Sequence, residues 1–171
     1  MKLNIPTLLL LALPTALSQG LNITAIAAVN GASVLQCWHL AAAPADFASA
    51  VNYPLGAGAF SGSFLGVIAP RTVVGKAWAP HVQFSFVLSG LVHISIPDSK
   101  QEAWIQGGRY GGIIAADTKD VSLTGHITEF PGGDETLIAQ FPMVGNEVPA
   151  HEVLYDGACG VGKLIGGKGG A

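Results

Sequence analysis

The polar residues that could do chemistry concentrate on one face of an expected strand, in the segment HVQFSFV at residues 81–87. Its odd positions include His81, Gln83 and Ser85, whereas its even positions are bulky and apolar. Because successive side chains of a strand point to opposite faces, the three polar residues are predicted to share one face. An imidazole, an amide and a hydroxyl can bind a ligand through hydrogen bonds or move a proton.

Two later segments carry three more polar residues that could face the same space. His126 and Thr128 alternate in one segment, and Gln140 lies in the last main apolar segment. If all six side chains turn inward, they form a pocket suited to a small polar molecule such as a sugar or an organic acid. The alternative is a two-sided sheet whose polar face meets water, which would leave no pocket.

The segments that must position these residues are short and apolar, and glycine and proline turns separate them. Strands are expected at residues 33–40, 64–69, 72–74, 102–105, 112–116, 126–130 and 136–141. Residues 81–96 are expected to form a hairpin that reverses at Ser89-Gly90, and residues 19–32 a lead-in to the first strand. No long amphipathic helix is indicated, so the fold class is all-β, either a sandwich or a closed jelly roll.

The first residues have the pattern of a secretory signal peptide: one lysine, a leucine-rich run too short to span a bilayer, and then small residues. We therefore expect residues 1–18 to be removed, residues 19–159 to form one β-barrel domain, and residues 160–171 to be a glycine-rich flexible tail. The mature protein is expected to be secreted and extracellular, with no membrane attachment after the signal is removed.

Export would place two cysteines and one glycosylation motif in an oxidising compartment. Cys37 and Cys159 are expected to form a disulfide there, the alternative being two unpaired buried thiols. Asn22, followed by isoleucine and threonine, begins an N-glycosylation sequon.

Composition and missing motifs exclude several function classes. The net charge is −3 and the basic residues are scattered, so nucleic acid is not an expected partner. Apolar residues make up 50% of the chain and charged residues 11%, which argues against disorder. The sequence contains no G-x-S-x-G elbow, phosphate loop, H-E-x-x-H or C-x-x-C motif, so no motif supports a hydrolase or a dinucleotide-dependent enzyme.

Several segments together resemble RmlC-like cupins and, more narrowly, the small secreted cupin-like proteins of filamentous fungi. The segments that carry the resemblance are FVLSGLVHI at 86–94, EAWI at 102–105, AADT at 115–118, GHITE at 125–129, DET at 134–136 and residues 149–159. The resemblance implies a jelly-roll barrel, also called a double-stranded β-helix. By analogy with the family, it also makes a homodimer an alternative to a monomer.

The cupin pattern also implies positions for a divalent metal. Aligned on the glycine of its first motif, the pattern places Gln83 at its glutamate and Ala77 and Ala79 at its two histidines, while His126 best matches its last histidine. Divalent metals of this kind prefer imidazole and carboxylate ligands. His81, Gln83 and His126 are therefore the residues left as metal candidates, and they form an incomplete ligand set.

His93 and Glu129 are expected to lie outside the pocket, and the tryptophans have two alternative roles. His93 is predicted to sit on the outer surface, and Glu129 is predicted to point away from the pocket. The three tryptophans, Trp38, Trp78 and Trp104, form either a stacking platform for sugars or packing at the ends of the barrel.

The residues and the resemblance leave three functions open. The first is a secreted protein whose barrel pocket binds a small ligand, either a sugar or an organic acid. The second is a metal-dependent cupin enzyme, namely an isomerase, epimerase or oxidase, with a metal-free epimerase that uses His126 as its base as a variant. The third is a non-catalytic extracellular protein whose outer face binds a partner.

Overall fold

The structure, a computed structural model, describes residues 21–40, 45–47, 50–52 and 60–164. Over these residues the fold is all-β, as predicted, and the helices are two single 3-10 turns, η1 (Val144–Asn146) and η2 (Val161–Lys163). Neither of these helices is long and apolar enough to cross a membrane. The signal peptide expected at residues 1–18 lies outside the described residues and stays a prediction.

Seven strands form the larger sheet, in the spatial order β13-β2-β1-β10-β7-β12-β5. Their bounds are β1 (Leu21–Val29), β2 (Ala32–Leu40), β5 (Phe64–Ile68), β7 (Gln83–Ser89), β10 (Gly112–Ala115), β12 (Thr136–Pro142) and β13 (His151–Asp156). All neighbours run antiparallel except β1 and β10, which are parallel. Four of these strands, β2, β5, β10 and β12, lie where the sequence predicts them.

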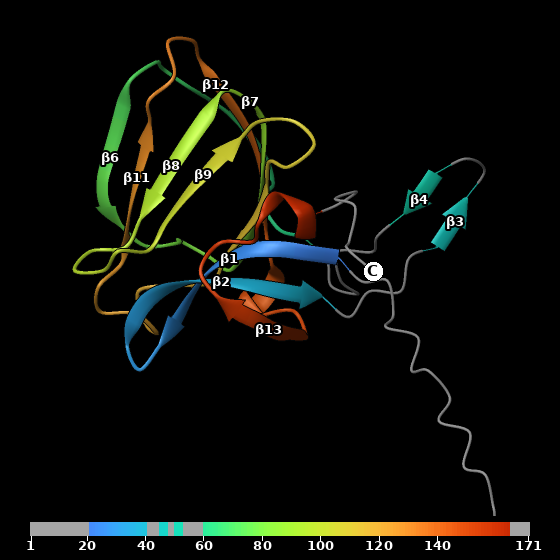
Figure 1. Cartoon of the computed structure of the whole chain (residues 1–171), viewed down its shortest axis with the longest axis horizontal. Helices are drawn as coiled ribbons and strands as arrows, with labels where there is room; N and C mark the ends of the chain where they lie inside the picture. Colours follow the sequence, from blue (N-terminus) through green and yellow to red (C-terminus); the bar gives the residue numbers. More distant parts are fainter. Residues whose placement is uncertain (1–20, 41–44, 48–49, 53–59, 165–171) are drawn as a thin grey trace, which may run out of the picture.

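Four strands form the smaller sheet, in the order β6-β11-β8-β9, which Figure 1 shows as a row. Their bounds are β6 (Thr72–Ala77), β11 (His126–Phe130), β8 (Leu91–Ser95) and β9 (Glu102–Gln106). A separate pair consists of β3 (Ala45–Phe47) and β4 (Ala50–Asn52).

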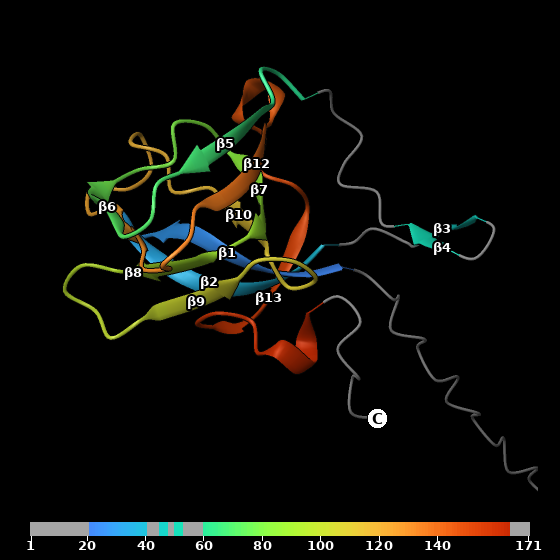
Figure 2. The same cartoon turned by 90° about the horizontal axis from the view of Figure 1, so that it is seen from above.

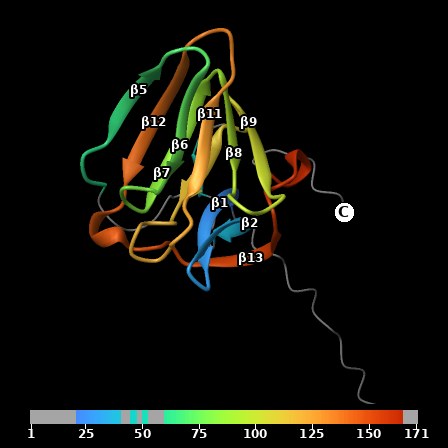
Figure 3. The ribbon, with the colours of Figure 1, turned by 90° about the vertical axis from the view of Figure 1, so that its left-hand side faces the viewer.

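The main hydrophobic core lies between the two sheets, which face each other in Figure 3. Val87 and Ile138 from the larger sheet belong to the same buried cluster as Ile94 and Ile105 from the smaller one. This arrangement is that of a β-sandwich, in which the inward side chains of both sheets share one apolar layer.

The predicted hairpin at residues 81–96 is wrong. Its first arm is β7, which pairs with β10 and β12 in the larger sheet, and its second arm is β8, which pairs with β9 and β11 in the smaller sheet. Gly90 lies between the arms with a φ of 87°, and a Cβ at this position would collide with the side chain of Thr136. The glycine therefore carries the chain across the sandwich instead of reversing it within one sheet.

The predicted lead-in at residues 19–32 is also wrong, because it contains β1, a central strand of the larger sheet. One face of β1 turns to the core between the sheets through Ile26, while Leu21, Ile23 and Ala25 belong to a second buried cluster. A strand buried on both faces has no alternation of polar and apolar residues. The pattern that marks half-buried strands is therefore missing from this segment.

The sheets do not close into a barrel, so the closed form of the predicted jelly roll is wrong. β5 is the last strand of the larger sheet and β6 is an edge strand of the smaller sheet. The two strands follow each other through a short turn at residues 69–71 on one side of the sandwich (Figure 2). Within the described ranges, the sandwich therefore has an open side between these two edges.

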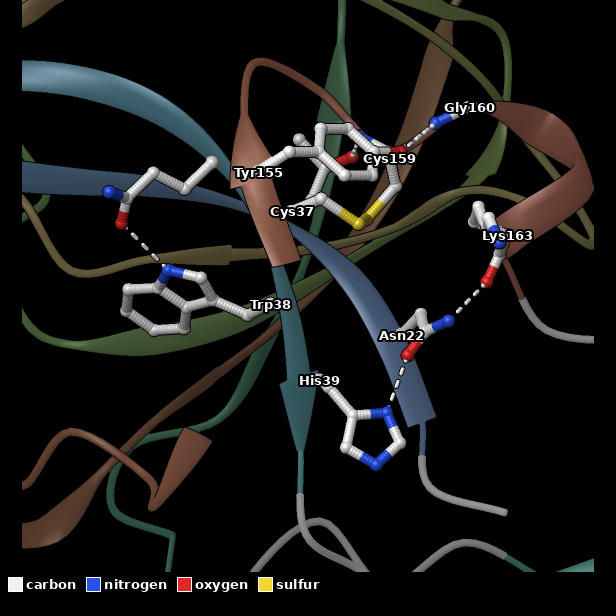
Figure 4. Close-up of a disulfide and its surroundings, with 10 residues drawn as sticks. Asn22, Cys37, Trp38, His39, Tyr155, Cys159, Gly160 and Lys163 are labelled. Carbon is white, nitrogen blue, oxygen red and sulfur yellow. Dashed lines mark hydrogen bonds between the residues drawn. A yellow bond between two sulfur atoms is a disulfide. The ribbon is translucent and has the colours of Figure 1, made fainter. Parts of the chain in front are cut away.

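The predicted disulfide between Cys37 and Cys159 is present, and it spans 122 positions of the sequence (Figure 4). It fastens the C-terminal segment to β2, and the backbone N–H of Cys159 also donates to the Thr24 hydroxyl on β1. The segment expected as a flexible tail thus begins with a folded part, because η2 follows directly and the carbonyl of Lys163 accepts from Asn22. Residues 165–171 of that tail lie outside the described residues.

Candidate ligand-binding site

A cavity of about 300 Å³ lies between the two sheets. Its apolar walls come from both of them and include Ile26, Val92, Ile94, Ile113, Phe130 and Ile138. The lining residues from β1, β7, β8 and β10 are buried, whereas Val74 on β6 is exposed and Ile68 on β5 is half-buried. Pro80, before β7, is the other exposed lining residue, so the cavity reaches the surface near Val74 and Pro80.

Five of the six residues predicted to form a pocket line this cavity. They are Gln83 and Ser85 on β7, His126 and Thr128 on β11, and Gln140 on β12. The alternation of side chains along β7 places Gln83 and Ser85 on the face that meets the smaller sheet. The interpretation in which this polar face meets bulk water is wrong, because Gln83 is only 4% exposed and Ser85 is buried as well.

His81 does not line the cavity, so its place in the predicted pocket is wrong. It is exposed and lies in the bend before β7, with its Nδ1 atom 3.2 Å from Oδ1 of Asn146. The strand begins only at Gln83. The alternation that assigned His81 to the inner face therefore does not extend to its position.

Two cavity residues on β7 differ in how their polar atoms are satisfied. The Ser85 hydroxyl accepts a hydrogen bond of 3.1 Å from Nε2 of Gln140 on the neighbouring strand. In contrast, Oε1 of Gln83 is buried and has no hydrogen-bond partner among the described residues. A buried acceptor without a partner costs about 1–3 kcal/mol, so the Gln83 amide is the group on the wall that would gain most from a ligand.

His126 is held from behind by Asp117, a residue that the sequence shows only as an isolated acid. Nδ1 of His126 lies 2.7 Å from Oδ2 of Asp117, which also accepts a 2.6 Å hydrogen bond from the hydroxyl of Ser33. Because Nδ1 faces a carboxylate, it carries the proton in the neutral ring, and Nε2 is the nitrogen left for contact with a ligand. The sequence held no spacing signal for this pair, since Asp117 precedes the loop that leads to β11.

The cavity has little positive charge of its own. Within the described part of the chain its lining contains no lysine or arginine. Two lysines lie near one lining residue, Trp78: the ammonium groups of Lys76 and Lys119 are 5.3 and 5.6 Å from its ring centroid. Asp117 adds a buried carboxylate behind His126, and its Oδ1 atom also lacks a partner in the described structure.

The residues of the cavity do not fit the divalent metal that the cupin pattern implies. Across the described ranges there is no group of three or more histidine, cysteine or acidic residues that could hold a metal ion. Ala77 and Ala79 line the cavity where the pattern has histidines, and His81 lies elsewhere. Of the candidate trio, only Gln83 and His126 share the cavity, and one imidazole with an amide is a poor ligand set.

His93 lies on the outer face of the smaller sheet, as predicted, between two carboxylates. Its Nδ1 atom is 2.7 Å from Glu129 and its Nε2 atom is 3.0 Å from Glu102. Partial burial alone would lower the pKa of His93, but the hydrogen bonds to Glu129 and Glu102 outweigh it, so the pKa lies above the ordinary 6.5. Glu129 points away from the cavity, also as predicted.

The three tryptophans do not form a common platform for sugars. Trp38 is buried and its ring stacks on His151, with 3.6 Å between ring centroids. Trp78 lines the cavity. Trp104 is 55% exposed on the outer face and stacks on His93. The three rings therefore serve three different regions.

The predicted glycosylation sequon is part of the packed structure (Figure 4). Nδ2 of Asn22 donates a 2.8 Å hydrogen bond to the carbonyl of Lys163, and its Oδ1 lies 2.7 Å from Nδ1 of His39. Thr24 of the same sequon is buried and accepts from the backbone of Cys159. The atom that would carry a glycan is thus engaged with the C-terminal turn.

Comparison with known proteins assigns no family to this chain. No protein-family model matches the sequence, and no curated protein matches it. The resemblance to cupins therefore rests on the sequence segments alone and stays a prediction.

Proposed function

We propose that this chain is a secreted, cupin-like protein that binds a small molecule in the cavity between its two sheets. The observation that carries the proposal is Oε1 of Gln83, a buried acceptor on the cavity wall without a partner in the described residues. A ligand that donates to this atom would offset its desolvation cost of about 1–3 kcal/mol. The disulfide supports the secreted part of the proposal, because such bonds persist in oxidising compartments.

The size of the cavity supports a ligand of modest size. An apolar cavity of about 150 Å³ is large enough to hold benzene. The cavity here, at about 300 Å³, has room for a molecule with a ring and a short substituent. Sugars and organic acids, the ligand classes predicted from the sequence, fall within this size range.

The test compares two tryptophan substitutions on the same strand. Thr128→Trp places a large ring at a half-buried position that lines the cavity, whereas Ile127→Trp places the same ring on the opposite face of β11. Thermal shift and NMR titration with a broad panel of small alcohols, acids and sugars would be run on both variants and on the wild type. We expect a compound that binds the wild type and Ile127→Trp but not Thr128→Trp. A panel without any binder, or equal binding to both variants, would contradict the proposal.

A second candidate is a metal-free proton-transfer enzyme, and the pair of His126 and Asp117 favours it. In such a reaction Nε2 of His126 takes a proton from a carbon next to a carbonyl, the electron pair moves onto the carbonyl oxygen as an enolate, and a solvent-derived proton returns to that carbon. Incubation with carbonyl compounds in D₂O tests it by NMR. Exchange at that carbon with the wild type, and its loss in Asp117→Asn, would support an enzyme, while no exchange would leave binding alone.

Pairing of two copies into a homodimer is a further part of the proposal. The two strands that border the open side expose apolar side chains on the outer faces of their sheets, among them Leu65 and Val67 on β5 and Val73 on β6. Exposed apolar edge strands of this kind favour contact with another chain. Size-exclusion chromatography with light scattering separates a dimer from a monomer.

A further inference from the structure

We infer that the cavity selects a small molecule with an apolar body and a single hydroxyl-type donor, and that it discriminates against free sugars and carboxylates. The inference deepens the proposed binding function and rests on it. It replaces the two ligand classes that the sequence predicts, sugars and organic acids, with a neutral and mostly apolar alcohol, because of the chemistry of the cavity wall.

The wall is too apolar to satisfy a sugar. Only five of the eighteen described lining residues are polar, and two of these, Ser85 and Gln140, already share a hydrogen bond. A sugar carries a hydroxyl on nearly every carbon, and each hydroxyl buried against isoleucine or phenylalanine would lose its hydrogen bonds to water without replacement. An apolar ring or chain instead gains from contact with Ile26, Ile94 and Ile113.

Among the described lining residues, the one fully buried polar atom without a hydrogen-bond partner is an acceptor, so a ligand that brings a donor satisfies it. Oε1 of Gln83 accepts and has no partner in the described part of the chain. Nε2 of His126 is a second acceptor in the neutral ring, because Nδ1 donates to Asp117. A hydroxyl supplies the donor that these atoms need, whereas a carboxylate has only acceptor oxygens.

A carboxylate would also lack a counter-charge. The described lining residues include no lysine or arginine, and the buried Asp117 lies directly behind His126. The ammonium groups of Lys76 and Lys119 lie over the ring of Trp78 and are not part of the wall. An anion beside Gln83 and His126 would therefore lose its hydration without gaining an ion pair there. A neutral hydroxyl carries no such cost.

The rim of the cavity is apolar, like most of its wall. Val74 at the rim is 54% exposed, and the adjacent β5 edge exposes Phe64 and Leu65. A ligand that enters past Val74 or Pro80, the two exposed lining residues, therefore meets apolar side chains first. This path suits a molecule that is apolar over most of its surface.

The test uses three probes with one skeleton: 2-phenylethanol, ethylbenzene and phenylacetate, with glucose as a fourth. NMR titration of the full chain at neutral pH gives a Kd for each probe with the wild type, Gln83→Met and Gln106→Met. Methionine matches glutamine in length, and Gln106 lies exposed on the outer face, so it is the matched control. The readout is the ratio of the ethylbenzene Kd to the 2-phenylethanol Kd, which cancels changes common to both probes.

We expect 2-phenylethanol to bind the wild type more tightly than phenylacetate, and glucose not to bind. Gln83→Met is expected to lower the ratio about five- to tenfold, as loss of one buried hydrogen bond predicts, while Gln106→Met leaves it unchanged. His126→Gln, which removes the Nε2 acceptor and is expected to lower the ratio about fivefold, provides a second variant if Gln83→Met does not fold.

The outcomes separate the inference from the proposed function. If phenylacetate or glucose binds better than the alcohol and Thr128→Trp abolishes that binding, the inference is overturned and the cavity remains a binding site. An unchanged ratio in both Gln83→Met and His126→Gln also overturns it. If neither these probes nor the broad panel binds, the proposed function fails as well.

Discussion

Two histidines on opposite faces of the smaller sheet show how differently this fold uses the same side chain. On the outer face, both ring nitrogens of His93 bind glutamates, so its hydrogen bonding is complete. On the inner face, His126 binds Asp117 through one nitrogen and turns toward a cavity whose other wall contains the amide oxygen of Gln83, which has no partner among the described residues. Complete pairing indicates a structural role, while incomplete pairing inside a cavity indicates a place for a ligand.

The largest difference between the two regions is expected in the free energy of unfolding when the carboxylate partner of each histidine is removed. Asp117→Ala leaves the buried His126 ring and the Ser33 hydroxyl without their common acceptor, and we expect it to lower the free energy of unfolding by about 3–5 kcal/mol. Glu129→Ala removes one of the two carboxylates of His93, and because Glu129 is 38% exposed the loss is expected to stay below about 1 kcal/mol. Urea denaturation measures the free energy of unfolding of both variants. Equal losses of stability would contradict the difference between the two histidines.

The next largest difference is expected in ligand affinity, when each of the two histidines is substituted. His126→Gln is expected to weaken the binding of 2-phenylethanol about fivefold, since the ligand loses one hydrogen-bonding partner in the cavity. His93→Gln is expected to leave this binding unchanged, because His93 lies on the other face of the sheet. The measurement is an NMR titration of each variant. A loss of binding in His93→Gln would show that the outer face takes part.

The pH dependence of stability should depend on His93. Because the folded protein raises the pKa of His93, its contribution is present in full below the unfolded pKa of about 6.5 and is lost as the pH rises through the folded value. Both glutamates are partly exposed, so the contribution is expected to stay below about 1 kcal/mol. Comparing wild type with His93→Gln by thermal unfolding at pH 5.5 and pH 8 checks the sign. A larger difference at pH 8 would be the opposite of the expected result.

The smallest effect on stability is expected from removing the Gln83 amide, whose oxygen has no partner among the described residues. Gln83→Met replaces a buried acceptor, unpartnered within the described ranges, by an apolar group of similar length. Such a replacement should leave the free energy of unfolding unchanged or raise it by up to about 1 kcal/mol. Denaturation in the absence of ligand measures it. A loss of several kcal/mol would indicate that Gln83 has a structural role and would weaken the case for a ligand.

The inner region could be predicted from sequence to the extent that it depends on local alternation. The parity of residues along β7 and β11 places Gln83, Ser85, His126 and Thr128 on the faces that meet, and this required only the period of a strand. The same rule failed at His81 because the strand starts two residues later. Local rules thus hold only within the bounds of an element.

The features that could not be predicted depend on contacts between distant segments. Nothing in residues 81–96 specifies that β7 and β8 enter different sheets, because each pairs with strands from other parts of the chain. The contact between Asp117 and His126 likewise depends on the path of the loop between them. The carboxylate that positions the cavity histidine therefore became visible only in the structure.

A methyl NMR titration with 2-phenylethanol, on protein labelled at its isoleucines, asks most directly whether a ligand binds between the sheets. Ile94 and Ile113 line the cavity, whereas Ile127 lies on the opposite face of the smaller sheet. We predict saturable shifts of the Ile94 and Ile113 methyl signals and none at Ile127. Shifts confined to Ile127, or no shifts at any isoleucine for any probe, would contradict a binding site between the sheets.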